Sequence, residues 1–99
     1  MIVYEINISI PKDLNNDYMI WLKNHMQTML TFKGFLKYKL FSVKSDDSNI
    51  INVCVHYYIK SIVFYDLYIQ NYSNNMRSNT PKIFNEVKMN RRVLNEVNI

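Results

Sequence analysis

The feature that most constrains the fold of this chain is the strict alternation of residues 2 to 10, IVYEINISI. Every even position of this stretch is isoleucine or tyrosine, and the odd positions are Val3, Glu5, Asn7 and Ser9. Successive side chains of a β-strand point to opposite faces of a sheet, so a period of two predicts a strand with one buried face. The proline that follows has no backbone N–H to donate and should end the strand.

A helix is predicted next, across the stretch DYMIWLKNHMQTML of residues 17 to 30. Asp13 or Asn16 should cap its first turn, and the helix should run to about Phe32. At about 100° per residue, one arc of this helix is apolar except for a single histidine. The arc consists of Leu14, Tyr18, Trp21, Leu22, His25 and Met29, with Met26 at its edge. Gly34 is expected just past the helix end, where a positive φ is common.

Two strands should follow, at residues 35 to 43 and 50 to 59, joined by the polar turn KSDDSN as in a hairpin. In the second of them, the side chains expected in the core are Ile51, Val53, Val55, Tyr57 and Ile59. Ser61 should cap another helix over residues 62 to 75. The buried stripe predicted for this helix is Phe64, Leu67, Tyr68 and Tyr72.

The last third of the chain is patterned less clearly. Residues 76 to 84 are expected to form a short helical or irregular turn, anchored by Ile83 and Phe84. A final strand is predicted at about residues 86 to 94, but its pattern does not indicate which side faces the core. The tail, residues 95 to 99, is expected to fray.

The predicted order of elements is β-α-β-β-α-β, the order of an α+β ferredoxin-like sandwich. Its four-stranded antiparallel sheet carries both helices on one face. A chain of 99 residues, with no linker or repeat, is expected to be a single domain over residues 1 to 99.

Composition favours a cytoplasmic protein. Cys54 is the only cysteine and cannot form an intrachain disulfide, which favours a reducing compartment. The N-terminus alternates as a strand does and has no basic region of the signal-peptide kind. No apolar run approaches the ~20 residues of a membrane-spanning helix, so no membrane association is expected.

The face of the sheet away from the helices is predicted to be an interface. Phe35, Phe41, Tyr58 and Val3 would form an exposed apolar patch there, and such patches usually mark interfaces. Burial against a second copy through a two-fold axis would cover it, so a homodimer is expected. The residues assigned to this interface are Val3, Glu5, Phe41, Cys54, His56 and Tyr58. Glu5 is expected to pair across it with Lys37, Lys39 or an arginine of the last strand.

Nucleic acid is an alternative partner for the same face, because RNA-recognition modules share this order of elements and stack bases on their open sheet. The third strand, INVCVHYYI, lacks the aromatic and glycine pattern of those modules. The first strand offers Glu5 and Asn7 where an aromatic residue is wanted, and the net charge of +4 is mild. Nucleic-acid binding therefore ranks below self-association.

Three segments resemble one family of small bacterial proteins. MIVYEINISIP at the N-terminus, YMIWLKNHMQTMLTFKGFL across the first helix, and RRVL near the end are similar to the DUF4286 family. That family belongs to the dimeric α/β-barrel superfamily, which includes antibiotic-biosynthesis-type monooxygenases and muconolactone isomerases. The resemblance implies a sheet-to-sheet dimer and, from the wider superfamily, a ligand pocket between helices and sheet. The matching residue types are Trp21, His25 and Met29. It implies no particular reaction, and fold analogy alone does not establish one.

His25 is the candidate catalytic residue, and two interpretations of it stay open. It is either a core histidine bonded to a backbone carbonyl, to Tyr4, to Tyr57 or to water, or a pocket histidine that shuttles protons or anchors a ligand. The candidate ligand-binding residues are Tyr4, Trp21, His25, Met29 and Tyr57. The expected function is small-molecule binding or a structural role, with cofactor-independent oxygenation or isomerisation as the enzymatic alternative.

Metal binding and nucleophilic catalysis are not expected. His25 and His56 should project from opposite sides of the sheet, and no third ligand has metal-site spacing. Cys54 and His56 lie side by side on one strand, with Glu5 as a possible orienting group, but a lone strand cysteine is usually a packing residue. No glycine-rich phosphate loop is present, and no cofactor is expected.

Overall fold

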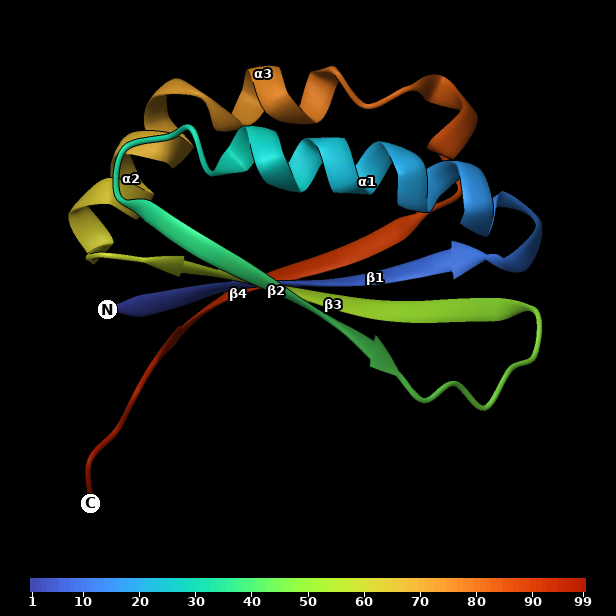
Figure 1. The fold of residues 1–99 in the computed structure, drawn as a ribbon, viewed down its shortest axis with the longest axis horizontal. Helices are drawn as coiled ribbons and strands as arrows, with labels where there is room; N and C mark the ends of the chain where they lie inside the picture. Colours follow the sequence, from blue (N-terminus) through green and yellow to red (C-terminus); the bar gives the residue numbers. More distant parts are fainter.

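The computed structural model describes residues 1–99 of the chain. Its elements, in chain order, are β1 (Ile2–Pro11), a 3₁₀ turn η1 (Lys12–Leu14), α1 (Asn15–Met29), β2 (Phe35–Val43), β3 (Ile50–Ile59), α2 (Ile62–Asn71), α3 (Ser73–Ser78), a second 3₁₀ turn η2 (Lys82–Phe84) and β4 (Lys88–Asn95). Figure 1 shows all three helices above one face of the sheet and none below it.

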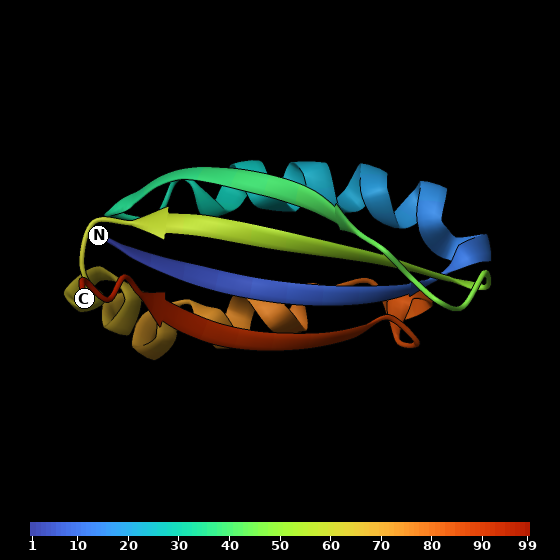
Figure 2. The ribbon, with the colours of Figure 1, turned by 90° about the horizontal axis from the view of Figure 1, so that it is seen from below.

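The four strands form one antiparallel sheet in the order β2-β3-β1-β4. Figure 2 shows α1 behind the side of the sheet that holds β2 and β3, and α2 and α3 behind the β4 side. The predicted ferredoxin-like arrangement is therefore confirmed. The second predicted helix differs from the prediction, because it is split into α2 and α3 at Tyr72, whose φ of −128° is not helical.

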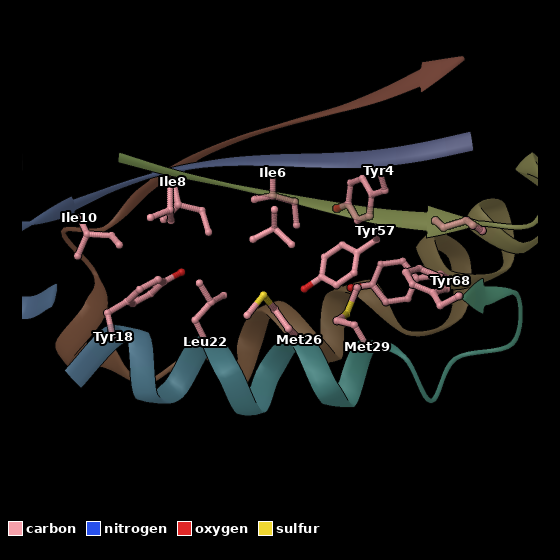
Figure 3. Close-up of a cluster of buried hydrophobic side chains, with 14 of the residues drawn as sticks. Tyr4, Ile6, Ile8, Ile10, Tyr18, Leu22, Met26, Met29, Tyr57 and Tyr68 are labelled. Carbon is pink, nitrogen blue, oxygen red and sulfur yellow. The ribbon is translucent and has the colours of Figure 1, made fainter. Parts of the chain in front are cut away.

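The core lies between the sheet and the helices, as Figure 3 shows. The even-numbered side chains of β1, from Ile2 to Ile10, are all buried, as the alternation predicted. On β3, four of the five side chains expected in the core are buried, and Ile51 is half-buried against them. The period-two pattern is reliable here because both strands are central, so each has a fully covered face.

Phe35 corrects the prediction for the open face. A β-bulge between Phe35 and Lys37 shifts the register of β2, and the Phe35 side chain is buried in the core beside Tyr57 and Tyr68. Assigning it to the open apolar patch was wrong, because an extra residue in one strand reverses the faces that alternation assigns. Leu36, the residue at the bulge, is exposed instead.

Other local predictions were also wrong. No side chain caps α1, which follows directly from η1 and ends at Met29, about three residues early. The buried stripe predicted for residues 62 to 75 is confirmed for Phe64 and Tyr68, which pack against the core with Tyr65 and Ile69. It was wrong for Leu67 and Tyr72, which are 43% and 50% exposed. Ile83 is exposed, and Phe84 alone anchors its turn.

The structure settles the orientation of the last strand. β4 pairs with β1 so that Met89, Arg91 and Val93 lie opposite Ile8, Ile6 and Tyr4, on the helix side of the sheet. Lys88, Asn90 and Arg92 therefore belong to the open face. The strand ends at Asn95, and residues 96 to 99 lie outside the sheet and are exposed (Figure 1). None of the helices is both long and apolar enough to cross a membrane.

Candidate functional site

A cavity lies between the sheet and α1. The five residues that the sequence suggested for ligand binding, Tyr4, Trp21, His25, Met29 and Tyr57, all line it. They come together because β1 and β3 pair directly and α1 crosses their covered face, so three separate apolar patterns converge. Their contribution to binding stays a prediction, but the structure brings all of them to one place.

Two tyrosine hydroxyls inside this cavity have no hydrogen-bond partner. Tyr18 on α1 and Tyr57 on β3 are both 0% exposed, and neither hydroxyl is bonded to another residue. Figure 3 shows the two hydroxyls directed into the space between α1 and the sheet. Burial raises the pKa of Tyr18 to about 12 and raises the pKa of Tyr57 further, so both are neutral hydroxyls.

His25 forms part of the wall of the cavity. Its ring stacks on the Trp21 indole, with centroids 4.7 Å apart and planes at 18°. No hydrogen bond joins it to Tyr4 or Tyr57, the side-chain partners that the structural interpretation suggested. Burial and then the positive charge of Arg91 lower the pKa of His25, so the imidazole is neutral at pH 7 and can accept a proton.

A surface groove lies on the other side of that wall. The groove, of about 210 Å³, is lined by Asn24, Thr28 and Asn79 together with Trp21, His25 and Met76. The last three also line the cavity, so they separate it from the groove. Methionine and a stacked ring pair on a half-buried wall can change rotamer without disturbing the sheet.

The cavity as it stands is small. Its volume is about 30 Å³, which is room for about two waters by the usual minimum of 10–15 Å³ each. A larger molecule therefore needs the wall to open. Three of the lining residues are methionines, Met29, Met76 and Met89, whose flexible side chains can repack around a guest.

Several lining residues were missed by sequence reasoning, chiefly Tyr18, Tyr68, Met76, Arg77, Met89 and Arg91. Arg91 lies on the helix side of β4, and its Nη2 is 2.9 Å from the Met89 sulfur. Arg77 on α3 donates from Nη2 to the Tyr4 hydroxyl at 3.3 Å. The alternation of β4, which pairs Arg91 with apolar Met89 and Val93 on one side, was the available signal for Arg91.

The open face carries a second cluster, centred on Glu5. Its Oε1 accepts from Asn7 Nδ2 at 2.8 Å and from Arg92 Nε at 2.5 Å, and its Oε2 accepts from His56 Nε2 at 2.8 Å. These contacts, Arg92 first, outweigh the effect of burial and lower the pKa of Glu5 from 4.5 to about 2. The predicted pairing with an arginine of the last strand thus exists within one chain, not across an interface.

All six residues predicted for the interface lie on this face. The strand register places Val3 beside Tyr58, Glu5 beside His56 and Phe41 beside Cys54. Phe41 is 42% exposed, and its ring contacts His56 edge to face at 5.0 Å. Aromatic side chains therefore lie beside the polar cluster on this face, together with Lys37 and Lys39, whose ammonium groups lie over the Tyr58 ring.

Cys54, His56 and Glu5 also approach one another, with ligand-type atoms within 4.8 Å. Sequence reasoning missed Glu5 as a third ligand because it lies on another strand. The Glu5 oxygens already accept three hydrogen bonds, and a guanidinium lies against them, which disfavours a cation. Burial, followed by the Glu5 charge, raises the pKa of Cys54, so the thiol is protonated and a poor nucleophile.

Comparison with solved structures supports the fold. The chain is similar to a dimeric ferredoxin-like protein from an uncultured marine organism, with 12% identity, 94% of this chain and 92% of that chain covered, and a TM-score of 0.70. It is also similar to a mutant of SnoaB, a cofactor-independent oxygenase from Streptomyces nogalater, with 8% identity, coverage of 99% and 95%, and a TM-score of 0.69.

A de novo designed protein, Foldit4, matches as well, with 9% identity, coverage of 97% and 98%, and a TM-score of 0.62. A fold shared with a designed protein shows that these likenesses establish architecture and not activity. No curated protein matches the sequence. The model of a domain of unknown function, DUF4286, matches residues 1–97, and the chain belongs to that family.

Proposed function

We propose that the protein binds a small molecule in the cavity between α1 and the sheet. The observation that carries the proposal is the pair of fully buried hydroxyls, of Tyr18 and Tyr57, that face one cavity without a partner. A buried polar group without a partner costs about 1–3 kcal/mol. Two of them in a core of this size are explained if a ligand supplies their hydrogen bonds.

Entry would occur through the wall of Trp21, His25 and Met76. Opening it would join the cavity to the groove between α1 and α3 and give a ligand site large enough for a ring. The polar residues of the groove, Asn24 and Asn79, would then meet the outer end of the ligand.

The proposal is tested by titrating small aromatic compounds into ¹⁵N-labelled protein. Trp21 is the only tryptophan, so its indole N–H gives one resonance that reports on the cavity wall. We expect ligands to shift that resonance and to leave the side-chain amide of Asn7, on the open face, unmoved. Met76→Ala widens the entrance and should speed association. The proposal would be refuted if the compounds shifted only resonances of the open face, or if no compound shifted the Trp21 resonance.

Enzymatic proton transfer is the second candidate, and the position of His25 favours it. The neutral imidazole lies on the wall that a ligand would pass, and neither Tyr4 nor Tyr57 is hydrogen-bonded to it. It would act as general base in an oxygenation or isomerisation that needs no cofactor. SnoaB, with the same fold, is described as such an oxygenase.

His25→Gln separates the two candidates once a ligand is known. Glutamine keeps the approximate size and hydrogen-bonding capacity but cannot take up a proton. For an enzyme, turnover should fall by about 10²–10⁴-fold while the ligand still shifts the Trp21 resonance. Unchanged turnover, or loss of folding as the sole effect, would leave His25 without a catalytic role.

We also propose that the open face of the sheet binds a second copy of the chain. Phe41 and Val43 are more than 40% exposed there, and a neighbouring structure of the same fold is described as dimeric. Light scattering after size exclusion should give twice the mass of 12.0 kDa. Phe41→Glu should yield monomers, whereas Ile83→Glu, at an exposed apolar side chain of η2 away from the open face, should not. A monomeric wild-type protein at micromolar concentration would refute the dimer.

A further inference from the structure

The charge of the cavity points to the chemistry of its ligand. Resting on the proposed pocket, we infer that the ligand is a small carboxylate with a flat apolar body, and that its carboxylate pairs with the guanidinium of Arg91. The inference goes beyond the pocket itself, because a cavity of this shape could hold a neutral molecule.

Arg91 has no acidic partner. The two ion pairs of the protein both involve Glu5, which lies on the opposite face of the sheet. Arg91 is half-buried, and its guanidinium contacts the Met89 sulfur, a weak acceptor. A guanidinium carries five donors, so a half-buried one without a carboxylate or carbonyl oxygen leaves strong donors for a ligand.

No acidic side chain balances this charge. Of the 16 residues that line the cavity, two are arginines and none is aspartate or glutamate. The positive charge of Arg91 lowers the pKa of His25, as burial does. It also lowers the pKa values of Tyr18 and Tyr68, where burial has the larger and opposite effect. The cavity therefore has a positive potential in a setting of low dielectric, which attracts an anion and repels a cation.

The unpartnered hydroxyls fit the same ligand. Tyr18 and Tyr57 are neutral and can each donate an O–H to a carboxylate or carbonyl oxygen. A neutral apolar guest would leave both hydroxyls and the guanidinium without acceptors, at the cost that already burdens the empty cavity. The two oxygens of a carboxylate would accept from the guanidinium, and their remaining lone pairs could accept from a tyrosine hydroxyl.

The rest of the cavity suits a flat apolar body. Its floor consists of Ile6, Ile8 and Val55 from the sheet, and its sides include the rings of Tyr4, Tyr68 and Trp21. Aromatic rings in edge and tilted arrangements already fill this region, so a planar group can pack among them with the same geometry.

The test uses two probes of nearly the same size and shape, the anion benzoate and the neutral amide benzamide, titrated into the ¹⁵N-labelled full chain up to the millimolar range. Both are read from the Trp21 indole resonance. We expect benzoate to bind about 10-fold more tightly than benzamide, the size of effect typical of a charge-assisted hydrogen-bonded pair.

Arg91→Gln should abolish the preference for benzoate. Lys88→Gln is the matched control, because it removes the same charge from the same strand but on the open face, opposite Ser9. It should keep the preference. Arg91→Lys retains the charge without the planar fork, and should keep part of the preference even if the glutamine variant folds poorly.

Three results would count against the inference. Equal affinities for benzoate and benzamide, or a preference that survives Arg91→Gln, would overturn the carboxylate and leave the pocket standing. A Trp21 resonance that responds to neither probe nor to any other small aromatic compound would overturn the pocket, and the carboxylate with it.

Discussion

Tyr57→Phe should make the protein more stable, which is unusual for a substitution at a fully buried residue. The Tyr57 hydroxyl is buried and unpartnered, so the native state carries a desolvation cost that the unfolded state does not. That cost is about 1–3 kcal/mol. The removed oxygen leaves a slightly larger void, and a water in the 30 Å³ cavity would recover part of the cost, so both reduce the gain.

The net expectation is a gain of about 1 kcal/mol in the free energy of unfolding. For a domain of 99 residues this corresponds to a rise of roughly 4–8 °C in Tm. Tyr4→Phe is the matched control, since the same atom is removed from a neighbouring core ring. The Tyr4 hydroxyl accepts a hydrogen bond from Arg77, so its removal should cost up to about 1 kcal/mol. The two variants should therefore change stability in opposite directions.

Urea unfolding followed by circular dichroism measures both changes, at one protein concentration so that self-association does not contribute. Tyr57→Phe should also lower the affinity of any ligand that shifts the Trp21 resonance. A loss of 1 kcal/mol or more for Tyr57→Phe, equal to or larger than that for Tyr4→Phe, would refute the reasoning. It would mean that the hydroxyl is bonded, through tightly held water, and that the cavity is a structural one.

The remaining predictions concern Gly34 after α1, Glu5 on the open face and His25 in the cavity wall. Gly34→Ala should destabilise the fold by about 2–4 kcal/mol in urea unfolding, because Gly34 has a φ of +87° and an added Cβ would lie 2.2 Å from Phe64 Cγ. Glu5→Gln should cost about 1–2 kcal/mol at pH 7, a discounted value since Arg92 is 64% exposed. Because the Glu5 pKa is lowered, its stabilisation is complete above pH 4.5 and is lost as the pH falls towards 2, so the variant should flatten the stability profile in that interval. His25 should titrate below 6.5 by NMR, and a midpoint above 6.5 would contradict its burial.

The fold was predictable from the sequence where burial is one-sided and local. β1 and β3 are central strands covered on one face by helices, so their alternation directly records which side is buried. The bounds of the edge strand β2 were predicted correctly, but the face on which Phe35 lies was not predictable, because a bulge after Phe35 leaves no mark in the apolar pattern. β4 was ambiguous because an arginine and a methionine occupy its covered face, and a pattern cannot distinguish a covered arginine from a solvated one.

The site was predictable to the same extent. Tyr4, Trp21 and Tyr57 were found because they belong to apolar faces that must converge on the core. What sets the cavity apart could not be found in this way. Whether the hydroxyl of Tyr57 has a partner depends on atoms from other elements, and so does the lack of an acid beside Arg91. Patterns in one sequence describe faces of elements, whereas hydrogen-bond satisfaction is a property of the assembled core.

The two faces of the sheet differ in how many of their polar groups have hydrogen-bond partners. This difference indicates which face suits self-association and which suits ligand binding. On the open face, Glu5 satisfies Arg92, Asn7 and His56, and Ser9 bonds to a neighbouring strand. A satisfied polar cluster can be buried by a second subunit with little penalty, but its acceptors are already used and offer little to a ligand. On the helix side, hydroxyls and a guanidinium lack acceptors inside a cavity. Such groups lower stability unless a bound molecule uses them. The proposals therefore assign ligand binding to the helix side and self-association to the open face.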